Sequence, residues 1–542
     1  MRKDSFLKGT IIASMAIIIT KIIGVLYVIP FYDIIGENGG VLYSYAYNIY
    51  ALFLNISTAG IPIALSMIIS EYIALNKLDA KERAYSLGKK VIMTFSIVAF
   101  LILFIFSDYI ALFYVDGIAG SNPISDISLV IKAISISLII TPFLSVLRGY
   151  LQGHKFIAPS SISQVWEQIV RIVVVLLGSF LAINVFNSSI PVGVAVSLTG
   201  AFFGGVFAYI YLRFKINKNK KLFMTSDKKD EVTNKEIFKK IIFYSIPLII
   251  VSVTTDLYNL VDMKLIIKGL YMIGYDAADA ELISSIVATW APKICMIIMA
   301  IAMGLTTSLI PHIIEKYAKK EYAGSNKLFN QAVSTMIVIS LPMVFGIIIL
   351  SKDVYNIFYG TSLYGPNILI VSAIVNILWG TLSVINTSLQ GFKKFKLVII
   401  NTLIGLVINA ILDIPIILLL DKMNLTPYYG TLIATMIGTT TSITIALVYL
   451  KKKLNFKYMN ILRNISKTFV PILAMSIVIF TINYFVGDAS SRVISTIKVF
   501  FLAIIGALIY FAILYKNNGL YDIFGKEQIN NIMRRLHLKK SH

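Results

Sequence analysis

Long apolar runs separated by short polar breaks follow one another from one end of the chain to the other. A membrane-spanning helix needs about 20 mostly apolar residues, and the runs are continuous rather than alternating, unlike the strands of a membrane β-barrel. The pattern predicts an all-α integral membrane protein with about fourteen transmembrane helices. They are expected at residues 8–32, 41–70, 91–113, 127–151, 157–184, 190–212, 241–267, 282–311, 331–350, 366–390, 397–420, 428–450, 467–486 and 493–515.

Composition agrees with this pattern and excludes several classes of protein. Hydrophobic residues make up 57% of the 542 residues and charged residues 14%, against about 25% charged in an ordinary soluble domain. A soluble enzyme, a disordered chain and a disulfide scaffold are therefore excluded. The single cysteine, Cys295, cannot form an internal disulfide or a thiolate metal site. No P-loop, nucleophile triad or CxxC motif is present, so we expect no enzyme activity, metal, cofactor or ATP site.

The positions of the cations predict the orientation of the chain in the membrane. Of the 49 lysines and arginines, 38 lie on the side that holds the N-terminus, whereas only four lie in the opposite loops: Lys268, Lys352, Lys422 and Arg492. The positive-inside rule then places both termini in the cytoplasm. This topology explains most of the net charge of +22, so we expect no nucleic-acid partner.

Two segments of the chain resemble each other and predict an internal duplication. Leu144–Gly153 matches Leu382–Gly391 at an offset of 238 residues, and Gly60–Glu71 matches Gly304–Glu315 more weakly at an offset of 244. Each match relates helices six apart, as parallel repeats in transporters do. The expected organisation is two pseudo-symmetric six-helix lobes and two C-terminal helices: an N-lobe at 1–212 (helices 1–6), a basic cytoplasmic loop at 213–240, a C-lobe at 241–450 (helices 7–12), helices 13–14 within 451–515, and a basic cytoplasmic tail at 516–542. The tail is either an amphipathic helix on an anionic membrane surface or a purely topological signal.

Seven cations fall within the predicted spans, where a lipid-facing charge costs about 2.5–3.5 kcal/mol. Lys21 and Lys293 are the deepest, and we expect both to line a hydrated cavity. Arg171, Arg148 and Lys264 are further candidates for substrate contacts, with anchoring or snorkelling as the alternative for the last two. The remaining two, Lys132 and Lys498, lie within about a turn or two of outer helix ends and can snorkel.

Four acids also fall within the spans. Glu167 lies four residues before Arg171, a spacing that permits an ion pair on one helix face. Asp256 and Asp262 belong to one polar stripe, and Asp413 lies beside Pro415. These acids could couple an ion or pair with cations inside the protein. The excess of cations over acids favours an anionic substrate over a cationic one.

The segments Arg148-Gly-Tyr-Leu-Gln-Gly153 and Gln164-Val-Trp-Glu-Gln-Ile-Val-Arg171, together with the fourteen-helix pattern, resemble the polysaccharide-transporter branch of the multidrug/oligosaccharidyl-lipid/polysaccharide (MOP) exporter superfamily. Within it, the chain is similar to the SpoVB/YtgP group, which includes the MurJ-type lipid II flippases. The resemblance implies a V-shaped pair of lobes that alternate between inward- and outward-open states around a cationic cavity. It also implies that Lys21 corresponds to a first-helix arginine of that cavity and Lys293 to an eighth-helix cation. This chain departs from the family by carrying lysine where arginine is usual.

We therefore expect a flippase that moves an undecaprenyl-diphosphate-linked glycan across the plasma membrane, with lipid II, the peptidoglycan precursor, as its cargo. Its expected partners are this lipid-linked oligosaccharide diphosphate, membrane lipids and cell-wall synthesis proteins. Two alternatives stay open: a multidrug cation antiporter of the same superfamily, which should have a mainly acidic cavity, and a membrane glycosyltransferase or polymerase, which needs a sizeable catalytic loop that this chain lacks.

Overall fold

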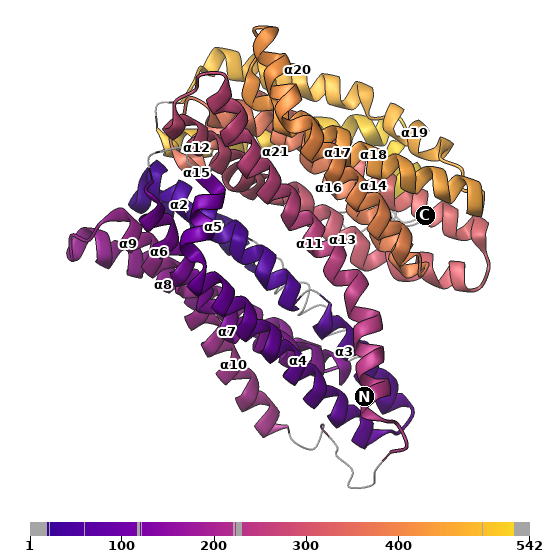
Figure 1. The fold of residues 1–542 in the computed structure, drawn as a ribbon. Coiled ribbons are helices and arrows are strands. Elements are labelled where there is room, and N and C mark those ends of the chain that lie inside the picture. The colour runs from indigo at the N-terminus through magenta and orange to yellow at the C-terminus, as the bar shows by residue number, and fades with distance from the viewer. Residues whose placement is uncertain are drawn as a thin grey trace. The chain divides into compact units, whose positions relative to one another are not determined.

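The computed structural model describes residues 19–20, 22–58, 60–115, 120, 122–219, 223, 230–489 and 491–524, which are helical with short connections and contain no strand (Figure 1). Twelve helical stretches in this part of the chain are long and apolar enough to cross a membrane. The first of them, Ile22–Ala74, includes the end of the first predicted span and the whole of the second, and the chain kinks between them at Gly36, where φ is 66°. The predicted all-α membrane class is confirmed. The predicted tail helix near residue 530 and Lys21 lie outside the described residues.

The chain divides into two compact units, Met1–Ala288 and Thr289–His542. The first unit contains α2 (Val28–Thr58), α3 (Ile61–Ala74), α4 (Leu78–Ile105), α5 (Ser107–Val115), α6 (Ile124–Ser135), α7 (Ser137–Gly153), α8 (Ile157–Phe180), the π-helix η1 (Leu181–Val185), α9 (Ile190–Leu198), α10 (Gly200–Lys218), α11 (Asn234–Met272) and α12 (Ala277–Ser285). A second π-helix, η3 (Ile286–Trp290), contains the boundary between the units.

The second unit contains α13 (Ala291–Ala318), α14 (Tyr322–Ile349), α15 (Ser351–Tyr359), α16 (Gly365–Gly391), α17 (Phe395–Lys422), the 3₁₀-helix η4 (Pro427–Tyr429), α18 (Gly430–Leu454), α19 (Met459–Ser466), α20 (Phe469–Val486), α21 (Arg492–Lys516) and α22 (Gly519–Phe524). The short helices α15, α19 and α22 were not expected from the apolar runs, because each is too short to span a membrane.

The core of the first unit lies where α3, α4, α7 and α11 pack together. Glycine permits the closest of these contacts, since a methyl group at Gly149 of α7 would clash with the backbone of Pro62 in α3. Helix α4 begins at Leu78, well before the predicted residue 91, because its polar first turns are packed: Ala80 and Ala84 are fully buried. The Asp230 carboxylate accepts a hydrogen bond from the Ala80 N–H at 2.8 Å, which satisfies one of the free donors at this helix start. Part of the predicted basic loop is thus fixed to α4.

The two predicted repeats share their local geometry at helix ends. After α7 and after α16, the chain turns through a left-handed residue, Lys155 (φ 59°) in one and Lys393 (φ 58°) in the other, 238 residues apart. The weaker repeat behaves likewise, with Asn76 (φ 56°) after α3 and Lys320 (φ 61°) after α13, 244 residues apart. Left-handed residues are uncommon outside glycine, so the same turn at both predicted offsets supports an internal duplication.

Candidate functional site

In the first unit, Arg171 of α8 lies among tyrosines of α2 and Tyr27, which directly precedes α2. Its guanidinium carbon lies 5.9 Å from the centre of the Tyr47 ring, a cation–π distance. Tyr47 stacks on Tyr43 with ring centres 5.6 Å apart, and the Tyr43 hydroxyl lies 3.3 Å from that of Tyr27. Tyr50 also lies within electrostatic range of the guanidinium. The tyrosines at 43, 47 and 50 share one helix face.

The spacing of Glu167 and Arg171 permits an ion pair, but the two residues do not form one. The Glu167 carboxylate instead forms an ion pair with the Arg148 guanidinium of α7 at 2.8 Å, and the two side chains are only 20% and 14% exposed. Arg148 Nε also donates to the Ser163 hydroxyl at 2.9 Å. Arg171 is left without a carboxylate partner in the described part of the chain. A guanidinium in this state can still donate two parallel hydrogen bonds to a phosphate.

The α11 stripe brings two acids into the first unit. Asp256 accepts a hydrogen bond from the Asn55 side-chain amide of α2 at 2.7 Å, while Asp262 is 6% exposed. On the same helix, the Lys264 ammonium lies 3.5 Å from the centre of the Phe113 ring of α5. Lys264 therefore packs against an aromatic face, which differs from a simple snorkelling geometry.

Lys293 belongs to the second unit, in the first turn of α13. Its ammonium lies 4.3 Å from the Trp290 ring centre. Trp290 is fully buried, contacts the Tyr359 ring at 5.4 Å, and its carbonyl accepts a 2.8 Å hydrogen bond from the Tyr359 hydroxyl. The ring beneath Lys293 is therefore held in place. That Lys293 and Lys21 share one hydrated cavity stays a prediction.

Asp413 is the most deeply buried of the predicted acids. It is fully buried on α17 and accepts a hydrogen bond from the Asn409 amide at 3.0 Å. The same amide lies 3.3 Å from the Thr435 hydroxyl of α18. Carboxylate, amide and hydroxyl oxygens are typical ligands of hard cations, although the described residues contain no group of three or more His, Cys, Asp or Glu that could hold a metal ion.

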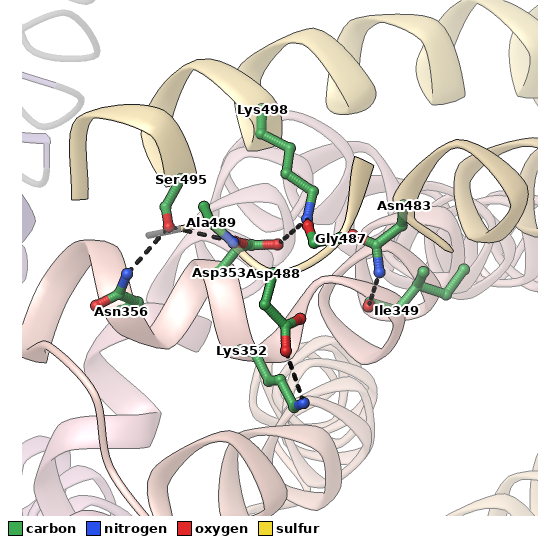
Figure 2. A network of polar contacts seen from close by, with 10 residues as sticks. All are labelled: Ile349, Lys352, Asp353, Asn356, Asn483, Gly487, Asp488, Ala489, Ser495 and Lys498. Atoms are coloured by element: carbon green, nitrogen blue, oxygen red, sulfur yellow. Dashed lines mark hydrogen bonds and ion pairs between the residues drawn. The ribbon is translucent and has the colours of Figure 1, made fainter. Parts of the chain in front are cut away.

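Lys498 does not snorkel, although its position near an outer helix end would allow it. Figure 2 shows its ammonium between Asp353 and the loop that joins α20 to α21. The Lys498 ammonium pairs with the Asp353 carboxylate at 2.6 Å and donates to the Gly487 carbonyl at 2.6 Å, and the paired side chains are 5% and 4% exposed. Asp353 also accepts from the Ser495 hydroxyl at 3.2 Å. A buried acid on α15 thus draws the lysine inward, and no run of apolar residues could have indicated this partner.

Sequence reasoning missed the surroundings of Arg171. From the sequence alone, the tyrosines at 43, 47 and 50 of the second predicted helix could pack against other helices or form an interfacial aromatic belt. Their spacing showed that the three tyrosines share a face, but only packing shows that this face meets Arg171.

Known proteins match the chain over most of its length. The family described as "Polysaccharide biosynthesis protein" matches residues 6–300. The lipid II flippase MurJ of Bacillus subtilis (strain 168) is 29% identical over 536 residues, covering 96% of this chain and 97% of that protein. Stage V sporulation protein B of the same organism is 24% identical, covering 76% and 77%.

Solved structures show the same fold. A lipid II flippase MurJ in an inward closed conformation aligns with a TM-score of 0.60 at 17% identity, covering 94% of this chain and 99% of that one. A MATE transporter in complex with MaL6 aligns with a TM-score of 0.61 at 13% identity, covering 83% and 96%. The chain therefore belongs to the polysaccharide biosynthesis protein family, and it is a multi-pass membrane protein with the fold seen in MurJ and in MATE transporters.

Proposed function

We propose that the protein is a flippase for an undecaprenyl-diphosphate-linked glycan, with lipid II as the first candidate. The similarity to the Bacillus lipid II flippase over nearly the whole chain supports this class of substrate. The diphosphate head group cannot cross hydrocarbon unaided, since an unpaired charge in the bilayer is costly. A polar, cationic path through the protein replaces its hydration while the polyprenyl tail stays in the lipid.

Arg171 carries the proposal. Its predicted acid partner is engaged by Arg148, and the described groups within electrostatic range of its guanidinium are the phenols of four tyrosines, at 27, 43, 47 and 50. A cation inside a membrane protein is retained where it pairs or serves a substrate, and a multidrug cation antiporter would gain nothing from it. Arg171 is therefore the main phosphate contact of the first unit, together with Lys21, and Lys293 serves the second unit. Arg148 acts mainly by holding Glu167, and Lys264 is a secondary contact.

The membrane potential drives net transport in this proposal. With both termini in the cytoplasm, an inside-negative potential favours outward movement of negative charge by about 2.3 kcal/mol per charge per 100 mV. Asp256 and Asp413, each held by an asparagine amide, are the acids through which a cation or proton would couple to the cycle. Glu167 and Asp262 serve pairing rather than coupling.

Complementation tests the proposal directly. The gene is expressed in a bacterium depleted of its own lipid II flippase and lacking a redundant one, and lipid II in the outer leaflet is measured by accessibility. Wild type restores growth and outer-leaflet lipid II. Because a charge-assisted hydrogen bond contributes about 1.5–3 kcal/mol, Arg171→Ala lowers the flipping rate about tenfold to a hundredfold, and Arg171→Lys retains part of it.

The matched control is Arg213→Ala, which removes an exposed arginine that stacks on Tyr209 at 5.4 Å. It should flip lipid II at the wild-type rate with equal membrane levels. If the wild-type protein leaves outer-leaflet lipid II unchanged, lipid II is not its substrate. Efflux of cationic dyes that depends on a sodium or proton gradient would favour the multidrug antiporter instead.

A further inference from the structure

Helix α19 is amphipathic and lies immediately before the membrane-spanning helix α20. Its residues Met459 and Leu462 are 72% and 63% exposed, whereas Ile461 on the opposite side is 7% exposed and packs toward α14. Besides Asn460, the exposed residues of α19 recur at positions i, i+3, i+4 and i+7, which is one face of a helix: Met459, Leu462, Arg463 and Ser466. Apolar and cationic side chains thus share the exposed face.

The segment around α19 is held rigidly in the second unit. Phe456 is 1% exposed and packs against Phe329 and Phe392, at ring-centre distances of 5.6 and 6.2 Å. The Lys457 carbonyl accepts a 2.6 Å hydrogen bond from the Asn330 amide, and the Tyr458 hydroxyl donates to the Leu447 carbonyl at 2.7 Å. These contacts fix the direction in which α19 presents its exposed face, so binding there costs little ordering of the chain.

The charge around α19 is of one sign. Residues 451–467 contain six cations and no acid, and the cations are Lys451, Lys452, Lys453, Lys457, Arg463 and Lys467. All of these except Lys467 are exposed. The cations of the turn between α13 and α14 differ, because Lys316 and Lys319 pair with Glu321 and Glu315 at 2.8 and 2.6 Å.

We propose that α19 is an interfacial helix that binds the head groups of anionic phospholipids. Met459 and Leu462 enter the boundary between head groups and acyl chains, while the adjacent cations hold lipid phosphates, as in other amphipathic interfacial helices. The apolar side chains favour a membrane surface over a soluble anion or a nucleic acid. The proposal is independent of the transported substrate, because it uses only the place of α19 next to a span.

Lipid titration of the purified full-length protein tests the head-group contact. Binding of phosphatidylglycerol and of phosphatidylcholine is measured by native mass spectrometry. Wild type should bind phosphatidylglycerol more tightly, and the double variant Lys457→Gln/Arg463→Gln should lose about fivefold for each cation removed. The matched double variant Lys316→Gln/Lys319→Gln removes two cations that acids already neutralise, and it should keep the wild-type preference. Equal affinity of wild type for the two lipids, or an equal loss in both double variants, would overturn the proposal.

A depth measurement tests the apolar contact separately. Since Cys295 is the only cysteine and is buried, a Cys295→Ser background accepts single spin labels at Leu462→Cys and, as the control, at Asp488→Cys in the loop after α20. In vesicles with phosphatidylglycerol, the label at 462 should be reached by oxygen in preference to a water-soluble nickel chelate, and the label at 488 by the chelate. A label at 462 that is as open to the chelate as the label at 488 would place α19 in water and refute insertion.

Discussion

At the scale of single residues, the partner of a charge inside the membrane was decided by neighbouring helices. The spacing of Glu167 and Arg171 allowed an ion pair along α8, yet Arg148 of α7 takes the carboxylate. Arg148 is also fixed by a hydrogen bond to Ser163, whereas the Arg171 guanidinium packs against the Tyr47 ring instead of the carboxylate. The sequence could therefore identify Arg171 as a membrane-embedded cation, but not that no acid of the described residues would pair with it.

Removal of Glu167 should expose the cost of the Arg148 charge. Because both side chains are largely but not fully buried, Glu167→Gln should destabilise the first unit by about 1–3 kcal/mol, the cost of a buried donor that loses its acceptor, measured as thermal unfolding in detergent. The double variant Arg148→Met/Glu167→Leu should recover part of this loss. By comparison, Asp488→Asn in the exposed Lys352–Asp488 pair should change stability by less than about 0.5 kcal/mol. If the double variant loses more stability than its two component single variants lose together, the pair does not compensate for the cost of its own burial.

His154, which follows α7, should make stability depend on pH. Burial lowers the pKa of its imidazole below the usual 6.5, although its Nδ1–H donates to the Tyr150 carbonyl at 2.9 Å. The unfolded chain takes up a proton near pH 6.5, whereas the folded protein does so only at lower pH. Stability from this group is therefore complete above about pH 6.5 and declines as the pH falls below it. Thermal midpoints between pH 8 and 5 should show this decline in wild type, and less of it in His154→Gln. An unchanged pH profile in that variant would exclude His154 as the cause, and the exposed His312→Gln serves as the control.

At the scale of elements, the apolar runs predicted the helices well and their connections poorly. Each predicted span within the described residues is helical, because a backbone in hydrocarbon must satisfy its own hydrogen bonds. The short helices α15 and α19 form outside such runs, and tertiary packing stabilises them. Helix α15 contributes Asp353, whose ion pair with Lys498 joins α15 to α21 within the second unit (Figure 2).

Breaking this tie should loosen the α20–α21 hairpin. Lys498→Met leaves the Asp353 carboxylate buried without its cation, which costs about 3–5 kcal/mol. Limited proteolysis of the loop between α20 and α21 should accelerate accordingly. Lys498→Met/Asp353→Leu removes both charges and should restore most of the resistance. Cleavage of the single variant at the wild-type rate would show that the hairpin is held by apolar packing alone.

At the scale of the whole molecule, charge placement predicts how the protein lies in the membrane. Because 38 of 49 cations fall on one side, we expect the turn between α13 and α14 in the cytoplasm and the loop between α20 and α21 outside. In a Cys295→Ser background, a membrane-impermeant maleimide added to intact cells should label Asp488→Cys, and should label Lys320→Cys only after permeabilisation. The reverse labelling would invert the proposed topology and with it the direction of transport.

The sequence by itself determined the membrane class, the helical spans and the sign of the embedded charge, and it predicted an internal duplication that the matching helix ends support. These follow from local rules: apolar length fixes a span, cations set orientation, and repeated segments form the same helix ends, as Lys155 and Lys393 do. Only the tertiary structure decided which charges meet. The partners Arg148–Glu167 and Lys498–Asp353 come from different helices, and their pairing depends on how side chains from distant segments pack, which periodicity along one helix does not encode.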